Sequence, residues 1–137
     1  MSKFALRKRE EINGKTNCYS LEIRGRCQFD EFWETLKNED SYDSELDTLQ
    51  TLLILVSNST HLPGCKYHPL DIDQPYRGWE IKTKNLRLYL IHLKPLGKVI
   101  LLGGKKNNQK QDLRQYRSLK VELIEAINNN KIKGIPL

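Results

Sequence analysis

The chain has 137 residues, of which 38% are hydrophobic and 29% charged, with a formal net charge of +6 at pH 7. This balance fits one globular domain over residues 1–137 and excludes a chain too polar to bury a core. No apolar run approaches the ~20 residues of a membrane-spanning helix, and the first residues lack the apolar segment of a signal peptide. Three sparse cysteines, Cys18, Cys27 and Cys65, are typical of a reducing compartment. We therefore expect a cytoplasmic protein with no membrane partner.

An N-terminal hairpin is the first predicted element. Residues 4–12 and 18–24 are rich in strand-forming side chains. Asn13-Gly14 between them supplies the positive φ angles of a tight hairpin turn, and Gly25 ends the second strand.

Two helices should follow the hairpin. Apolar side chains recur at helical spacing across residues 29–37. Asp43 or Ser44 can cap a second helix, which has a leucine-rich face and ends near Asn58. The apolar faces are typical of two packed helices.

The second half of the chain begins with a segment, residues 59–78, that is rich in proline and glycine and is expected to be a long loop, functional or partly stranded. Three strands follow, at residues 79–84, 86–93 and 99–102. Short turns separate them, so they should pair antiparallel. A helix over residues 112–129 comes last, and residues 131–137 are expected to form a loose tail. The predicted fold class is α+β: an antiparallel sheet with an N-terminal hairpin, two packed helices, a three-strand meander and a C-terminal helix.

Charge is unevenly distributed along the chain. Eleven basic residues and one acid, Asp112, lie between Lys82 and Lys120, whereas residues 28–50 carry eight acidic residues and one basic residue, Lys37. Like charges at this density destabilise a compact fold unless an anion compensates for them, and a polyphosphate strand gains affinity by releasing counterions. The asymmetry predicts a nucleic-acid partner. The alternative is that the chain has two solvated faces of opposite charge. The basic residues are Lys82, Lys84, Arg87, Lys94, Lys98, Lys105, Lys106, Lys110, Arg114, Arg117 and Lys120.

Three short motifs occur in a fixed order: Gly78-Trp79-Glu80-Ile81-Lys82, then Leu86-Arg87-Leu88-Tyr89, then a run from Val99 that ends in Gly103-Gly104-Lys105-Lys106. Together with the order of the elements, they resemble the RelE/HigB superfamily of toxins, especially its phage-derived group, over about residues 29–127. The resemblance implies a RelE-like fold and a ribonuclease that cuts mRNA, usually on the ribosome, and is neutralised by an antitoxin protein. It also implies that no metal or other cofactor is used.

The chain departs from the pattern of that family in three places. Lys82 stands where the phage-derived group usually has arginine, and the N-terminal hairpin adds a strand. Several branches use late histidines or tyrosines as acids and bases, but here no histidine follows His92. This leaves open a catalytically silent domain of the same fold that binds nucleic acid or a protein. A third alternative is a small adaptor domain whose charges serve solubility.

Metal-free RNA cleavage needs a base for the 2′-hydroxyl, positive charge at the phosphate and a proton for the leaving oxygen. Arg87 matches the strand arginine of the family, and a guanidinium can hold phosphate oxygens bidentately. The alternative is that its stem covers the sheet. Glu80 is a candidate general base, or else an ion-pair partner for Arg87 across the hairpin, which we consider the better interpretation.

Lys106 completes the phosphate site as a further catalytic candidate. Lys105 and Lys106 follow Gly103-Gly104, where small residues allow amide groups to face an anion, unless the segment is simply a polar hairpin end.

Tyr116 is a catalytic candidate for base stacking or proton transfer, although its place on the apolar side of the last helix favours a core position. His92 shares a face with leucines and is interpreted as a core histidine. The side chains expected to contact RNA are Lys82, Lys84, Lys105, Lys110, Arg114 and Arg117.

The loop carries a possible metal-ligand spacing in His61, Cys65 and His68, with Asp71 or Asp73 as a fourth ligand. A second paired-ligand unit is missing, so the sequence predicts no metal site.

Overall fold

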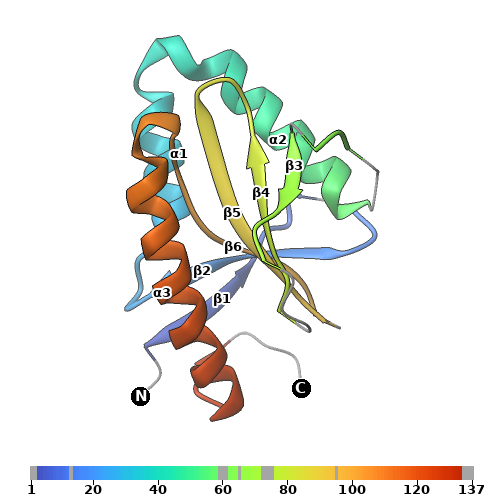
Figure 1. The fold of residues 1–137 in the computed structure, drawn as a ribbon, viewed down its shortest axis with the longest axis vertical. Helices are drawn as coiled ribbons and strands as arrows, with labels where there is room; N and C mark the ends of the chain where they lie inside the picture. Colours follow the sequence, from blue (N-terminus) through green and yellow to red (C-terminus); the bar gives the residue numbers. More distant parts are fainter. Residues whose placement is uncertain are drawn as a thin grey trace.

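The structure is a computed structural model, described here for residues 3–12, 14–58, 62–64, 66–71, 76–94 and 96–133. These residues form an α+β fold in which three α-helices pack on a mixed sheet (Figure 1). Its elements are β1 (Phe4–Lys8), β2 (Asn17–Ile23), α1 (Gln28–Lys37), α2 (Asp43–Ser57), β3 (Tyr67–Pro69), β4 (Gly78–Lys82), β5 (Leu86–Leu93), β6 (Gly97–Lys105), α3 (Gln109–Asn128) and β7 (Ile132–Lys133). Two short 3-10 turns, η1 (Asp40–Tyr42) and η2 (Lys106–Asn108), precede α2 and α3.

The strand order in the sheet is β3-β4-β5-β6-β2-β1-β7. The hairpin β1–β2 and the meander β4–β5–β6 are antiparallel, as predicted. The prediction of an antiparallel sheet is wrong at two places, because β2 pairs parallel with β6 and β1 pairs parallel with β7. Turn lengths predict how consecutive strands pair, but they say nothing about how the hairpin joins the meander.

Two short strands lie at the edges of the sheet. β3, in the segment expected to be a functional or partly stranded loop, has three residues and pairs antiparallel with β4; β7 has two residues and corrects the expected loose tail at Ile132–Lys133. Segments this short show no periodicity from which a strand could be predicted. Strand β6 is also longer than expected and includes Gly103, Gly104 and Lys105, so the turn begins at Lys106. Asn13, from the predicted hairpin turn, and Pro95, from the predicted Pro95-Leu96-Gly97 turn between the last two strands of the meander, lie outside the described residues.

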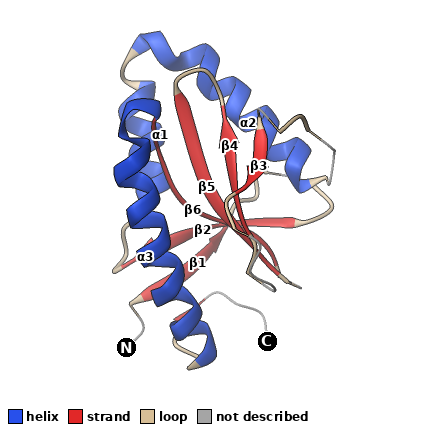
Figure 2. Ribbon diagram, in the orientation of Figure 1, coloured by secondary structure: helices blue, strands red, loops and turns tan. Residues whose placement is uncertain are grey.

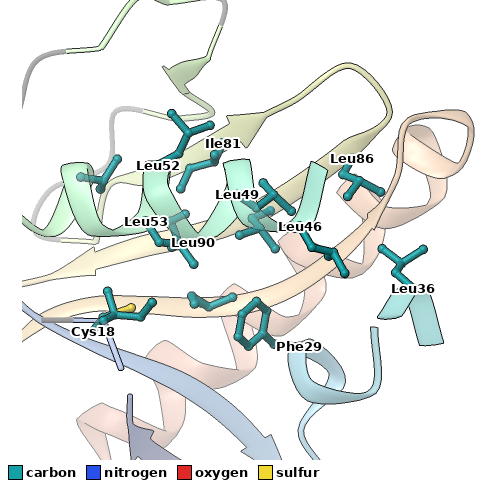
Figure 3. Packing of buried hydrophobic residues seen from close by; sticks show 14 of the residues in the cluster. Cys18, Phe29, Leu36, Leu46, Leu49, Leu52, Leu53, Ile81, Leu86 and Leu90 are labelled. Carbon is teal, nitrogen blue, oxygen red and sulfur yellow. The ribbon is translucent and has the colours of Figure 1, made fainter. Parts of the chain in front are cut away.

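The helices cover the two faces of the sheet. Helices α1 and α2 lie on one face and α3 on the other (Figure 2). On the first face, the leucines of α2 pack against Leu86 and Leu90 of β5 and Ile81 of β4 (Figure 3). On the second face, Tyr116 and its neighbours on α3 pack with alternate residues of β5.

Strand β5 is therefore covered on both faces. Because side chains alternate along a strand, Leu86 faces α2 while Arg87 and Tyr89 face the α3 side. Glu80 lies opposite Tyr89, and Lys82 lies opposite Arg87. The fold thus gathers the polar residues of β4 and β5 on the face that α3 covers.

Candidate nucleic-acid interface

Two basic turns meet at one end of the sheet. The Lys106 backbone amide donates to the Asn85 carbonyl at 2.7 Å, which ties the β6–α3 turn to the β4–β5 turn. Tyr42, Asn85, Lys105, Lys106 and Asn107 line a shallow hollow of about 320 Å³ there. Lys105 Nζ lies 3.4 Å from Glu39 Oε2 and 5.1 Å from the centre of the Tyr42 ring. The β4–β5 turn and the β6–α3 turn therefore contribute to one surface, on which Lys105 and Lys106 lie.

A carboxylate from α2 holds the β4–β5 turn in place. Glu45 accepts hydrogen bonds from the Thr83 hydroxyl, from the Asn85 amide at 2.7 Å and from Asn85 Nδ2 at 3.0 Å. Burial alone would raise the pKa of Glu45, but these hydrogen bonds outweigh it and lower the pKa. Lys84, between Thr83 and Asn85, is exposed on this fixed turn.

A basic stripe continues from the turns along α3. Lys110, Arg114 and Arg117 are all exposed, and their spacing of four and three residues places them on one side of the helix. The stripe spans about 10 Å at a rise of ~1.5 Å per residue. We use "basic stripe" for Lys84, Lys105, Lys106, Lys110, Arg114 and Arg117 together; Lys82, the remaining predicted RNA contact, is half-buried beside it.

Arg87 lies beneath the turn and not on the open surface. It is only 6% exposed, and its Nη1 donates to the carbonyls of Thr83 at 2.7 Å and Leu86 at 2.8 Å. Its Nε has no hydrogen-bond partner among the described residues. Among the described residues, Arg87 and Glu80 do not form the expected ion pair. The β4–β5 register places Glu80 opposite Tyr89. In this conformation the guanidinium supports its own hairpin turn.

Glu80 is fully buried, at 0% exposed, and contacts two side chains from other elements. Its Oε2 accepts a hydrogen bond from Gln109 Nε2 of α3 at 2.8 Å, and its Oε1 lies 3.2 Å from His68 Nε2 of β3. Full burial prevents Glu80 itself from reaching RNA in this conformation. His68 lies opposite Glu80 in the sheet, a register that sequence reasoning missed because β3 gives no periodic signal.

Tyr116 occupies the core position that its helical face predicts. It is 2% exposed, and its hydroxyl donates to Asp71 Oδ2 at 3.0 Å. Asp71 also accepts from Lys120 Nζ at 2.7 Å and from the Gly78 amide at 2.8 Å. Burial would raise the pKa of Asp71, but these three donors outweigh it and lower the pKa. A side chain at Gly78 would overlap the Tyr116 hydroxyl, so the backbone approaches closely there.

The two glycines of β6 make room for protein side chains. A Cβ at Gly103 would overlap Phe32 of α1, and one at Gly104 would overlap the carboxylate of Asp112. The Gly103 amide donates to Gln28 Oε1 at 2.8 Å, so this amide is not free to bind an anion. Burial raises the pKa of Asp112, whose Oδ2 has no hydrogen-bond partner within the described residues.

The remaining sequence predictions concern histidines and metal. His92 is half-buried, and burial together with Lys98 and Lys94 lowers its pKa. His61, Cys65 and Asp73 lie outside the described residues. Among the residues that the structure does describe, no group of three or more His, Cys, Asp or Glu side chains is arranged to hold a metal ion.

None of the helices in the described ranges combines the length and apolar character needed to cross a membrane.

A scan against protein-family models, a search of curated proteins and a search of solved structures each find no match to this chain.

Proposed function

We propose that this protein binds single-stranded RNA and cleaves it without a metal ion, as an mRNA-cutting toxin of RelE/HigB type. The substrate would be mRNA, free or on the ribosome, and a cognate antitoxin protein would hold the activity in check. The observation that carries the proposal is the basic stripe, which joins two hydrogen-bonded turns to one side of α3.

The stripe suits a polyanion better than it suits an internal partner. Lys105 forms an ion pair with Glu39. The other five residues of the stripe form no ion pair with any of the described residues. Unneutralised charges this close together repel one another, and phosphates that displace their counterions would relieve the repulsion.

A second candidate is a catalytically silent RNA-binding domain, and the burial of three proposed catalytic residues favours it. Arg87, Glu80 and Tyr116 are 6%, 0% and 2% exposed. Lys106 is the exposed member of the predicted catalytic set. Binding and cleavage therefore need separate measurements.

The binding test is a salt titration with a single-stranded RNA oligonucleotide. Each phosphate contact contributes about −0.7 to the slope of log affinity against log salt. Reversing three charges of the stripe, in Lys110→Glu/Arg114→Glu/Arg117→Glu, should lower affinity at least tenfold and flatten the slope by about 2. The matched control, Lys8→Glu/Lys15→Glu/Lys37→Glu, changes net charge equally at exposed positions elsewhere and should have a much smaller effect. Equal losses in both variants would contradict a dedicated interface.

The cleavage test is incubation of the purified protein with mRNA in EDTA, followed by mapping of the new ends. Cleavage should persist in EDTA, and induction of the protein in a bacterial host should produce the same ends. A cleavage that stops in EDTA and returns with zinc would contradict the metal-free mechanism. Binding without any cleavage would favour the silent domain.

A further inference from the structure

A half-exposed histidine lies beside the buried carboxylate of β4. His68 Nε2 is 3.2 Å from Glu80 Oε1, and the two side chains are 31% and 0% exposed. The pair forms across two neighbouring strands, since His68 and Glu80 are direct partners in the β3–β4 register. One member is thus fixed in the interior while the other reaches solvent.

The pair has an unusual composition for a structural contact. A fully buried carboxylate is costly unless it is paired and hydrogen-bonded. Glu80 Oε1 nevertheless has no hydrogen-bond partner within the described residues, and its neighbour is a histidine, which can gain and lose a proton near neutral pH. A lysine or arginine would have neutralised the carboxylate permanently. A carboxylate beside an imidazole is the arrangement that orients a general base.

The pair is connected to the basic stripe through α3. Gln109, which donates to Glu80 Oε2 at 2.8 Å, immediately precedes Lys110 of the stripe. Lys82 lies two residues from Glu80 on the same face of the sheet, opposite Arg87. An RNA strand that follows the stripe would therefore approach the edge of the sheet where His68 lies.

We propose that His68 is the acid–base catalytic residue of the RNA-cleaving site and that Glu80 is the residue that positions it. This rests on the proposed function. With its Nε2 toward Glu80, His68 accepts the 2′-hydroxyl proton on Nδ1. The 2′-oxygen then attacks phosphorus and the bond from phosphorus to the 5′-oxygen breaks. The leaving 5′-oxygen takes a proton from a solvent water, and the products are a 2′,3′-cyclic phosphate and a 5′-hydroxyl. His68 returns its proton to solvent.

The other charged and titratable groups around the pair come from β4 itself, from β5 and from α3. Lys82 of β4 and Arg87 of β5 are basic; Tyr89 of β5 and Asp112 of α3 are acids. Burial, with the nearby carboxylates of Glu80 and Asp112, raises the pKa of Tyr89, so its hydroxyl stays protonated. Glu80 is the acidic group in direct contact with the imidazole.

The decisive variant is His68→Gln. A glutamine amide has a size similar to that of the imidazole and can lie beside Glu80 Oε1, 3.2 Å from His68 Nε2 in the wild type, but it cannot accept the proton. Cleavage should fall on the order of a hundredfold, while RNA affinity and melting temperature stay close to those of the wild type. His92→Gln is the matched control, because His92 faces the opposite side of the sheet. This variant should cleave RNA at the wild-type rate.

Two more measurements separate catalysis from structural support. Added imidazole should restore part of the cleavage lost in His68→Ala, which a purely structural contact would not allow. In Glu80→Gln, kcat should fall while KM for the RNA stays near its wild-type value, since the carboxylate that positions the imidazole is gone and the RNA-binding lysines and arginines are intact.

The inference is overturned if His68→Gln cleaves within a few-fold of a cleaving wild type, and in that case the proposed ribonuclease function survives. If the wild-type protein binds RNA but cleaves none between about pH 5 and 9, the ribonuclease function and the role of His68 fail together.

Discussion

At the scale of single residues, Glu45 links the acidic half of the chain to the basic half. Its carboxylate accepts from Thr83 and Asn85, which flank Lys84, and so it fixes the turn that displays this lysine. The hydrogen bonds favour the ionised carboxylate and explain why its pKa is lowered despite burial.

Glu45→Gln should reduce the free energy of unfolding by about 1–2 kcal/mol, because an amide oxygen cannot satisfy the same donors and its NH₂ group faces the Asn85 amide. Urea denaturation at pH 7 measures the loss. Asp47→Asn, an exposed change of the same kind on α2, is the control and should be neutral. An unchanged midpoint in Glu45→Gln would mean that the turn is held by its backbone bonds alone.

Arg87→Ala should destabilise the protein by about 1–3 kcal/mol, because the carbonyls of Thr83 and Leu86 lose a charged donor. Arg87→Lys keeps the charge and part of the donor geometry, so it should recover some of the loss. Chemical denaturation and the cleavage assay should be run on the same samples. A variant with wild-type stability but no cleavage would restore Arg87 to the phosphate-binding role that the family resemblance implies.

At the scale of elements, α3 is docked by a polar contact as well as by apolar packing. The Asp71 carboxylate accepts hydrogen bonds from Tyr116 and Lys120 of α3 and from the Gly78 amide of β4. The segment before β4 thereby joins the helix to the sheet.

Tyr116→Phe should cost about 1 kcal/mol of stability, because it removes one hydrogen bond to Asp71 while keeping the ring. Its cleavage rate should equal that of the wild type once both are fully folded. A large loss of cleavage with unchanged stability would show that the tyrosine takes part in proton transfer after all.

The elements that were predictable from the sequence are those with a repeating pattern. The three helices and the meander show apolar periodicity or tight turns. The edge strands β3 and β7 and the parallel pairing of β2 with β6 depend on contacts between distant segments, and no local signal encodes them.

The residues of the site also divide into those that a local pattern predicts and those that depend on distant contacts. Exposed lysines could be predicted from charge density, and Tyr116 from its helical face. The burial of Arg87 could not be predicted. The alternation of side chains along β5 assigns Arg87 to one face of the sheet, but it does not show that α3 covers that face. The sequence indicates His68 only as a possible metal ligand, because its closeness to Glu80 depends on the pairing of β3 with β4.

At the scale of the whole molecule, three carboxylates make folding sensitive to acid. Asp30, Glu45 and Asp71 each have a pKa that burial would raise but that stronger hydrogen bonds lower. For Asp30 the principal donor is Arg9. A carboxyl whose folded pKa is depressed contributes stability above its unfolded pKa, about 4, and loses it as pH falls through the folded value.

Stability should therefore be level near neutral pH and fall below about pH 4. Asp112 acts in the opposite direction, because burial raises its pKa and protonation relieves that cost as pH falls. Thermal melts from pH 7 to pH 3 measure the balance. Asp71→Asn should be less stable at pH 7 and show a shallower fall in acid; an identical acid fall in this variant would remove Asp71 from the explanation.

The parallel pairing of β2 with β6 also determines when the sheet can close during synthesis. Asn17 and its partner Gly97 are eighty residues apart along the chain. At ~5–20 residues per second, about 4–16 s pass between their appearances. During that interval the hairpin presents an unpaired strand edge, which is a site for association with other nascent chains. Pairing over this separation also raises the contact order, so the central joint of the sheet should be among the last to form.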